Sequence, residues 1–208
     1  MMKLSASEQR LVDFACGQFG EQLCEFLLAG LGEETAGQRG RFNITYASGE
    51  DSVLKRHVEV ITYEPADGSS YLPRGRQPLI LITLLYLLMN SSQKSPNTLR
   101  YEMADVLSLL GWKDTKKARR EIDEAGGRYF KLTYTWKMND SELAEARLNS
   151  YTANEAMISE YESTVTNDGE SARIVFNEFF IKHLLGQSLF GIEWNNVSSV
   201  LLQFPSRK

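Results

Sequence analysis

The sequence predicts an α+β protein, and three observations lead to this class. Several segments carry apolar residues at the spacings of three and four that an amphipathic helix requires. Others are short alternating or β-branched runs bounded by turn residues, which is typical of strands. The chain of 208 residues is 42% hydrophobic and 24% charged, so it can bury a sizeable core in one large domain or two small ones.

The N-terminal part, residues 1–40, predicts a helix followed by a flexible linker. After Ser7, residues 8–31 form an amphipathic pattern that ends at glycines. Cys16 and Cys24 fall on this one helix, eight residues apart. Because a helix rises about 1.5 Å per residue, we expect the two thiols to lie too far apart to form a disulfide. Both thiols should therefore stay reduced.

Two strands and then three helices are expected in the middle of the chain. Residues 42–46 alternate, and residues 53–63 are rich in β-branched side chains, so both segments predict strands. The predicted helices span residues 78–90, 98–110 and 115–125. The first of them is apolar on nearly every side, which indicates a buried helix.

Capping and stop residues support the bounds of these helices. Pro78 suits a first helical position, Gly111 suits a C-terminal stop, and Asp114 suits an N-cap. Gly126 and Gly127 are expected to end the third helix.

The last third of the chain predicts further strands. Residues 129–136 have the alternation of a strand. Residues 156–166 and 172–176, joined through an Asp-Gly turn signal, predict a β-hairpin. A short helix is expected over residues 179–185.

Three helices followed by strands is the order of a winged helix-turn-helix. Here an N-terminal helix precedes it and a β-hairpin serves as the wing. The helix-turn-helix covers residues 98–125, with residues 111–113 as its turn, and the strand over 129–136 is expected to belong to the wing. The domain is expected to span residues 41–188, and its third helix to enter the major groove of DNA.

The third helix has a core-facing side and a cationic side. Ala118, Ile122 and Ala125 lie together at i, i+4 and i+7 and are expected to pack on the core. The opposite side holds the side chains expected to contact the groove, namely Lys116, Lys117, Arg119 and Arg120. Asp123 is expected to share this outward side, where it either limits entry into the groove or accepts from a cytosine.

Phosphate contacts are expected from cations around this helix. Lys113, Arg128 and Lys131 flank it in the sequence, and Arg74 and Arg76 lie just before the first helix. Their side chains can reach the phosphate oxygens that position a protein on a duplex.

Charge is segregated along the chain. The formal net charge of −4 by itself argues against nucleic acid as a partner. Residues 71–140, however, hold 12 basic and 7 acidic residues, a net charge of +5, so the remainder carries −9. A phosphate backbone senses charge within about 10 Å, so a basic module can bind DNA within an acidic protein. A solvated basic helix face also occurs in proteins that never bind DNA, but the helix-turn-helix spacing and the wing favour DNA binding.

Signals for catalysis, metal binding and membrane insertion are missing from the sequence. The two histidines, His57 and His183, lie in unrelated contexts, and no phosphate-binding glycine loop, nucleophile elbow or HExxH motif occurs. We therefore expect no enzyme activity, no cofactor and no metal site. The longest apolar run, residues 79–89, is shorter than the roughly 20 residues of a membrane span, and no signal peptide is recognisable. We expect a cytoplasmic protein with no membrane partner.

Three short segments resemble a known family. They are LPRGR at 72–76, LLGW at 109–112 and RIVFNEFF at 173–180. Over residues 72–186 the chain resembles plasmid replication initiator proteins of the winged-helix type, the replication initiator protein A group. The last segment is similar to that family's strand-to-helix junction after the wing.

The resemblance implies sequence-specific binding to repeated origin sites, opening of the duplex with host replication proteins, and autorepression through a homodimer. Such initiators usually carry two winged-helix domains, so residues 189–208 are expected to be a tail or the start of a second, truncated domain. Two other functions stay open. One is a transcriptional repressor with the same winged helix, and the other is a protein–protein interaction module in which the winged helix is a docking scaffold.

Overall fold

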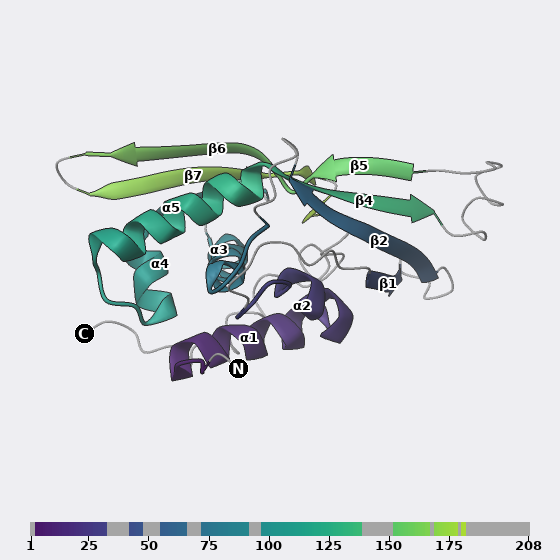
Figure 1. Cartoon of the computed structure of the whole chain (residues 1–208), viewed down its shortest axis with the longest axis horizontal. Coiled ribbons are helices and arrows are strands. Elements are labelled where there is room, and N and C mark those ends of the chain that lie inside the picture. The colour runs from purple at the N-terminus through teal and green to yellow at the C-terminus, as the bar shows by residue number, and fades with distance from the viewer. Residues whose placement is uncertain are drawn as a thin grey trace.

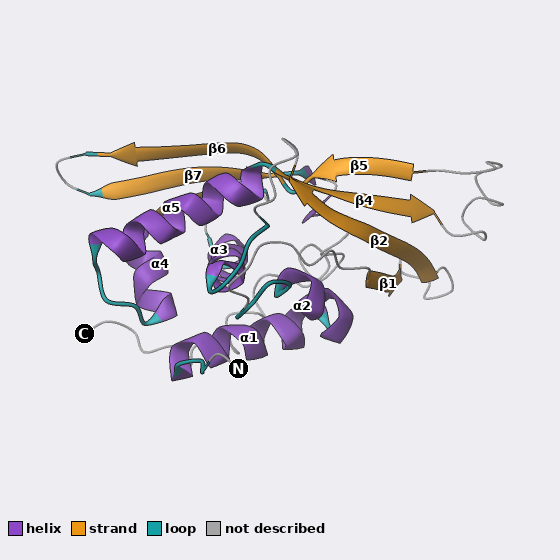
Figure 2. Cartoon of the chain, viewed as in Figure 1, coloured by secondary structure: helices purple, strands orange, loops and turns teal. Residues whose placement is uncertain are grey.

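Helices and strands form separate layers in the folded chain. The computed structural model describes residues 3–32, 42–47, 55–65, 72–91, 97–138, 152–166, 169–178 and 180–181. Its elements are α1 (Ala6–Phe19), α2 (Glu21–Leu27), β1 (Phe42–Ala47), β2 (Lys55–Pro65), α3 (Gln77–Met89), β3 (Thr98–Glu102), α4 (Met103–Leu110), α5 (Lys116–Phe130), β4 (Leu132–Met138), β5 (Thr152–Ala156), β6 (Ile158–Val165) and β7 (Glu170–Phe176). The hairpin β6–β7 and the strands β2, β4 and β5 run along one side of the molecule, with α1, α2, α4 and α5 beneath them (Figure 1). Figure 2 shows the same separation, with helices purple and strands orange. This arrangement confirms the α+β class.

The described strands form two antiparallel sheets. One has the order β1-β2-β4-β5, and the other has the order β3-β7-β6. In the second sheet, Ile174 of β7 pairs with Leu99 of β3 on one side and with Tyr161 of β6 on the other. Ala172, Ile174 and Phe176 are buried, so alternate residues of this central strand face the core.

The core is built around α3, as its all-round apolar sequence predicts. Its side chains from Pro78 to Tyr86 are all buried, and α1, α4, α5 and β3 contact it. Thr83 is fully buried, and its hydroxyl donates to the carbonyl of Leu79 at 2.8 Å, so its polar group is satisfied within the helix. Among the described helices, α3 included, none combines the length and the apolar character that crossing a membrane requires.

The single helix predicted over residues 8–31 is in fact two helices. Ser5, and not Ser7, is the N-cap of α1. The chain turns at Gly20, whose φ of +78° suits glycine, and α2 begins at the next residue. The apolar pattern that runs through the segment therefore belongs to two helices that pack on each other and on α3.

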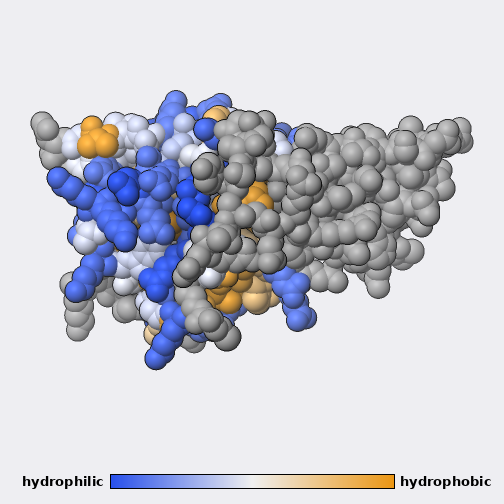
Figure 3. Space-filling model, viewed as in Figure 1, coloured by the Kyte–Doolittle hydropathy of each residue, from blue (hydrophilic) through white to orange (hydrophobic). Residues whose placement is uncertain are grey.

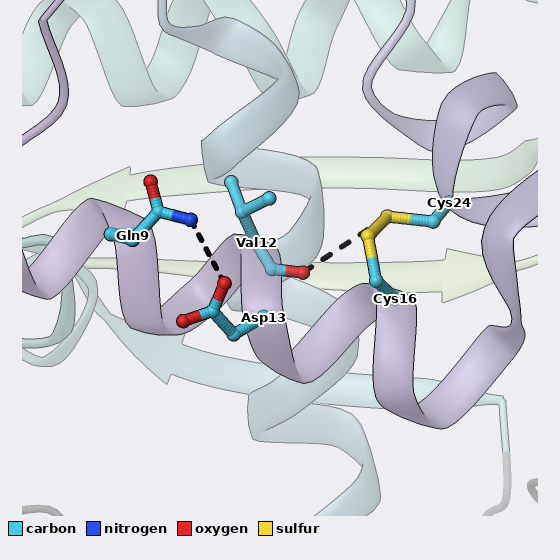
Figure 4. Close-up of a disulfide and its surroundings, with 5 residues drawn as sticks. All are labelled: Gln9, Val12, Asp13, Cys16 and Cys24. Atoms are coloured by element: carbon cyan, nitrogen blue, oxygen red, sulfur yellow. Dashed lines mark hydrogen bonds between the residues drawn. A yellow bond between two sulfur atoms is a disulfide. The ribbon is translucent and has the colours of Figure 1, made fainter.

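The prediction of two reduced thiols is also wrong, because Cys16 and Cys24 form a disulfide (Figure 4). The prediction assumed one straight helix. The turn at Gly20 brings the two Cα atoms to 4.9 Å, which lies within the range that a disulfide spans. The bond joins the last turn of α1 to α2.

The helix predicted over residues 98–110 begins only at Met103, and β3 occupies the first part of that range. In β3, Leu99 and Tyr101 are buried while the residues between and after them are exposed. This period of two allows β3 to pair with β7, so tertiary pairing overrides the helical spacing. Gly111 ends α4 in the left-handed conformation, at a φ of 68°, as predicted.

α5 extends beyond its predicted end. Gly126 and Gly127 lie inside it, and it continues to Phe130. Tyr129 is almost fully buried and gives the last turn an apolar anchor. Packing of this kind outweighs the low helix propensity of the two glycines.

The strand predicted over residues 129–136 is β4, and it is not in the same sheet as the β6–β7 hairpin. β4 pairs with β2 and β5 in the first sheet. The hairpin next to α5 is β6–β7, which confirms the hairpin predicted over residues 156–166 and 172–176. The short helix predicted over residues 179–185 lies almost wholly outside the described residues.

A buried carboxylate ties α1 to the rest of the helical layer. Glu8 is fully buried, and it forms a capping box in which its Oε2 accepts from the amide of Ser5 at 2.7 Å. Its Oε1 accepts from Nε1 of Trp112 at 3.0 Å and lies 3.3 Å from Nε of Arg76. One side chain thereby joins α1 to the turn after α4 and to the loop before α3.

The partners of Glu8 stabilise its charged form. Burial raises the pKa of the carboxyl, but the hydrogen bonds from Ser5 and Trp112 and the charge of Arg76 outweigh burial. The net result is a pKa below the usual value, so Glu8 is ionised at neutral pH. Its interactions therefore contribute to the free energy of unfolding at that pH.

We predict that Glu8→Ala lowers the free energy of unfolding by about 1–3 kcal/mol, because it removes the capping box and leaves the indole of Trp112 without its acceptor. Urea denaturation of the full chain measures this change. A matched control is Asp13→Ala, which removes an exposed carboxylate from the same helix. Equal effects of the two substitutions would contradict the role given to Glu8.

We also predict a pH dependence. Because folding lowers the pKa of Glu8, its contribution is fully present above the ordinary value of about 4.3 and is lost as the pH falls through the lowered pKa. Glu8→Gln removes this contribution, so the stability gap between wild type and variant should close on acidification. Urea denaturation over a series of pH values measures the gap, and a gap that stayed constant would refute the assignment.

Candidate nucleic-acid interface

α4 and α5 are held against each other by a short turn and a shared apolar contact. Val106 and Leu110 of α4 and Ile122 of α5 are all fully buried in one core. α5 then begins after Thr115, whose hydroxyl accepts from the amide of Ala118 at 3.1 Å. The orientation of α5 is thus fixed by packing on one side and by its cap at the start.

The predicted cationic side of α5 is exposed. Lys116 and Lys117 lie at its start and Lys113 lies in the turn before it, all open to solvent. Within the described part of the chain, no carboxylate is within ion-pair distance of these three lysines. On the opposite side Ile122 and Ala125 are fully buried, as predicted. Hydrophilic side chains gather on the surface over α4 and α5 (Figure 3).

Arg119 differs from these lysines because carboxylates hold it. Its guanidinium donates twice to Asp114, at 2.6 and 2.7 Å, and lies 3.5 Å from Glu170 at the start of β7. The hydrogen bonds from Arg119 hold the pKa of Asp114 below its usual range. Asp114, predicted as the N-cap of α5, pairs with Arg119, and Thr115 is the cap. Arg119 therefore fastens the start of α5 to the hairpin.

Arg120 is more accessible to solvent than Arg119. Its side chain is 74% exposed, and its Nε lies 3.2 Å from Glu124, one turn further along α5. Exposed ion pairs of this kind contribute little to stability, so the guanidinium can exchange Glu124 for another anion at small cost.

Three arginines that were predicted to contact phosphate lie away from the start of α5, and each has its own surroundings. Arg76 lies beside the buried Glu8. Arg128 donates from Nη1 to Oε1 of Gln77 at 3.2 Å, and the same oxygen accepts from the backbone amide of Arg74, also at 3.2 Å. Arg74 and Arg128, far apart in the sequence, are thereby brought to one hollow in the surface beside α5.

Lys131 lies at the opposite end of α5 from the predicted groove contacts. It is the C-cap of α5 and is exposed. The length of the helix separates it from Lys116 by about 22 Å along the axis. The chain then enters β4, in the other sheet.

Asp123 shares the side of α5 that holds Lys116 and Arg120, as predicted, and it also faces the hairpin. The hydroxyl of Tyr161 in β6 donates to its Oδ1 at 2.6 Å. Burial, together with Tyr101 and Asp123 nearby, raises the pKa of Tyr161, so the hydroxyl keeps its proton. The ring of Tyr161 lies against Gly126, where a Cβ would overlap it. These contacts fix the hairpin against the middle of α5.

The exposed surface of the hairpin is acidic. Glu160 and Glu162 of β6 are exposed, and they lie 2.6 and 3.9 Å from Arg173 of β7. Glu170 faces Arg119 on the side toward α5. Lys116, Arg119 and Arg120 line a hollow between α5 and the hairpin, together with Asp123 and Glu170. Both flanks of α5 therefore carry cations as well as carboxylates.

Three residues that position the interface were not singled out from the sequence, namely Glu8, Gln77 and Tyr161. Each acts on a partner at least 38 residues away along the chain. Two sequence signals could have found two of them. Ser5 and Glu8 form the Ser-x-x-Glu pattern of a capping box, and Gly126 inside a helical pattern signals a close approach of another side chain.

Metal-binding groups do not gather in the described part of the chain. No set of three or more His, Cys, Asp or Glu side chains there could hold a metal ion. His57 lies in β2, and His183 lies outside the described residues. The absence of a cofactor and of enzyme activity stays a prediction.

Comparisons with known proteins find a distant likeness in fold. No protein-family model and no curated protein matches the chain. A crystal structure of RctB domains 2-3 aligns over 77% of this chain and 58% of that chain, with a TM-score of 0.46 and 17% identity. A selenomethionine derivative of RctB domains 2 and 3 aligns over 86% of this chain and 61% of that chain, with a TM-score of 0.49 and 18% identity. This chain thus spans about three-fifths of the length of those chains.

We predict opposite effects of alanine at the two adjacent glycines of α5. Gly126→Ala should destabilise the fold by about 1–3 kcal/mol, because the new Cβ overlaps the ring of Tyr161. Gly127→Ala meets nothing within 4 Å and should stabilise the helix by about 0.5–1 kcal/mol. Thermal or urea unfolding measures both changes. Stabilisation by both substitutions would show that Tyr161 does not pack on α5.

Proposed function

We propose that the protein binds double-stranded DNA through a winged helix and that α5 enters the major groove. The observation that carries this proposal is the first half of α5. Lys116, Lys117 and Arg120 are exposed on one side, while Ile122 and Ala125 on the other side are fully buried. An α-helix fits the major groove, which is about 12 Å wide, and lysine and arginine side chains reach guanine edges and phosphates there.

The order of the elements supports a winged helix. α3, β3, α4, α5 and the hairpin β6–β7 follow one another along the chain, and β3 pairs with β7 in the sheet β3-β7-β6. A winged helix consists of a helix, a short strand, two helices joined by a turn, and a hairpin that pairs with the short strand. β4 and β5 are an insertion between α5 and the hairpin, and they join the other sheet.

The cations divide into two roles in this proposal. Lys116, Lys117 and Arg120 contact bases and nearby phosphates, and Lys113 contacts phosphate from the turn. Arg119, held by carboxylates, aligns α5 with the hairpin and contacts DNA only if it exchanges one of them. A phosphate role for the remaining predicted cations, Arg74, Arg76, Arg128 and Lys131, depends on how the duplex lies across the helix.

The resemblance of residues 72–186 to plasmid replication initiators supports a role at repeated origin sites. Host replication proteins and a second copy of the chain are the partners that this role requires. A transcriptional repressor uses the same interface without opening the duplex. A protein–protein module uses the same fold without binding DNA.

We predict that Arg120→Ala lowers the affinity for a selected DNA site by about 1–3 kcal/mol, because it removes a side chain that reaches base edges. The site is first selected from a pool of random duplexes, and gel shifts of the full chain measure the loss. Lys3→Ala, which removes a cation near the start of α1, is the matched control and should have little effect. An unchanged affinity of the Arg120 variant would refute the assignment of α5 as the reading helix.

The initiator role makes a separate prediction about the DNA. Supercoiled plasmid with tandem copies of the selected site should gain permanganate-reactive thymines beside them when the protein and host replication proteins are added. Binding without reactive thymines would identify a repressor. An affinity that stays flat as salt is raised would instead favour the protein–protein module, because phosphate contacts make DNA binding strongly salt dependent.

A further inference from the structure

Arg119 lies in a hollow of about 310 Å³ between α5 and the β6–β7 hairpin, which run side by side in Figure 1. Lys116 and Arg120 of the same helix also line the hollow, and Glu170 lines it from the hairpin. The side chain of Arg119 is 24% exposed, so a ligand in the hollow can reach its guanidinium. Arg119 is therefore a neighbour of the exposed cations that the proposed function assigns to the groove.

Asp114 holds one edge of the Arg119 guanidinium firmly. Nε and Nη2 of Arg119 donate to the two oxygens of Asp114 at 2.6 and 2.7 Å. Paired charge-assisted hydrogen bonds of this kind fix the plane of a guanidinium. Arg120, by contrast, is 74% exposed and has a single described contact, from its Nε to Glu124 at 3.2 Å. Arg119 has thus lost its side-chain freedom before a ligand arrives, whereas Arg120 would lose it on binding.

Glu170 holds the other edge of the guanidinium loosely. Beside the bonds to Asp114, Nη1 and the second hydrogen of Nη2 form a further pair of donors. Oε2 of Glu170 lies 3.5 Å from Nη1, which is longer than the roughly 2.7–2.9 Å of a strong charge-assisted hydrogen bond. Within the described residues, Asp114 and Glu170 are the acidic partners of Arg119. Because Glu170 is 33% exposed and its contact is long, another acceptor can replace it at small cost.

The edge that Glu170 covers matches the acceptors of a guanine. O6 and N7 of guanine are a pair of acceptors in the major groove, and two donors of one arginine edge bind them together. Asp114 balances the charge of Arg119, so what this side chain offers a duplex is a fixed pair of donors. Base edges are recognised by the geometry of donors and acceptors, whereas phosphates are bound mainly through charge. Arg119 therefore favours a base over a phosphate.

We propose that Asp114 and Glu170 set the DNA specificity of α5 through Arg119, because Asp114 orients the guanidinium while Glu170 competes with a guanine for its outer edge. The inference rests on the proposed function. In the complex, the guanine takes the place of Glu170, and Asp114 keeps its two hydrogen bonds. Asp114 is thus a positioning residue and Glu170 an internal competitor, although both are acidic partners of one arginine.

Two variants that remove one carboxylate each should therefore act in opposite directions. Fluorescence anisotropy of the full chain measures affinity for a selected duplex and a scrambled one, and their ratio is the preference. Asp114→Asn should lower the preference severalfold. Glu170→Gln should raise the affinity for the selected duplex severalfold without lowering the preference. Glu162→Gln, the matched charge change on the same hairpin, should stay close to wild type. Equal gains on both duplexes from all three variants would mean that only net charge matters and would overturn the inference.

Modified bases test the contact with guanine. Each guanine of the selected duplex is replaced in turn by 7-deazaguanine, which lacks the N7 acceptor. At the position that Arg119 reads, the wild type should lose affinity severalfold, whereas Arg119→Ala should lose nothing further. Arg119→Ala should also weaken binding to the selected duplex more than binding to the scrambled one. Equal losses on the two duplexes would assign Arg119 to a phosphate or to the fold alone and would overturn the inference.

A double variant and the wild type separate the possible failures. Arg119→Ala combined with Asp114→Asn should have the preference of Arg119→Ala alone, because Asp114 acts through Arg119. A further fall in preference would overturn the inference. Thermal unfolding confirms that each variant is folded. No DNA binding by the wild type would refute the proposed function and this inference with it. Selective binding by the wild type that Asp114→Asn leaves unchanged would refute the inference and leave the proposed function standing.

Discussion

The buried carboxylate of Glu8 joins parts of the chain that are far apart in sequence, and the interface depends on that connection. It caps α1, accepts from the indole of Trp112 in the turn before α5, and lies beside Arg76 in the loop before α3. A fully buried charge is costly unless its hydrogen bonds are complete, so the two segments and α1 must come together at one place. The start of α5 and the loop that flanks it are therefore positioned by the same residue.

The contacts of Glu8 fix where α5 lies, and the positions of the cations around α5 follow from this. Arg119 is held by Asp114 and Glu170, where it aligns the helix with the hairpin. Lys116 and Lys117 point into solvent from a helix whose other side is buried. The acidic net charge of the whole chain is compatible with this surface, because screening limits each charge to about 10 Å. A duplex that lay along α5 would meet lysines and arginines on both of its flanks.

Local patterns in the sequence predicted the features whose signal lies within their own segment. The apolar run of α3, the glycine stop of α4 at Gly111 and the β6–β7 hairpin are of this kind. Prediction was wrong where a distant partner decides the conformation. β3 becomes a strand because β7 pairs with it, α5 passes through Gly126 because Tyr161 needs the space, and the disulfide of α1 and α2 depends on the turn at Gly20. The cationic side of α5 could be found from periodicity alone, but the residues that orient it, such as Gln77, could not.

In the proposed complex, the lysines at the start of α5 face the DNA. Lysine acetylation followed by mass spectrometry tests it most directly, by comparing the reactivity of each lysine in the free protein and in its complex with a selected duplex. We expect the duplex to protect Lys113, Lys116 and Lys117 strongly, and Lys3 to stay as reactive as in the free protein. Unchanged reactivity of the three lysines in a saturated complex would contradict it.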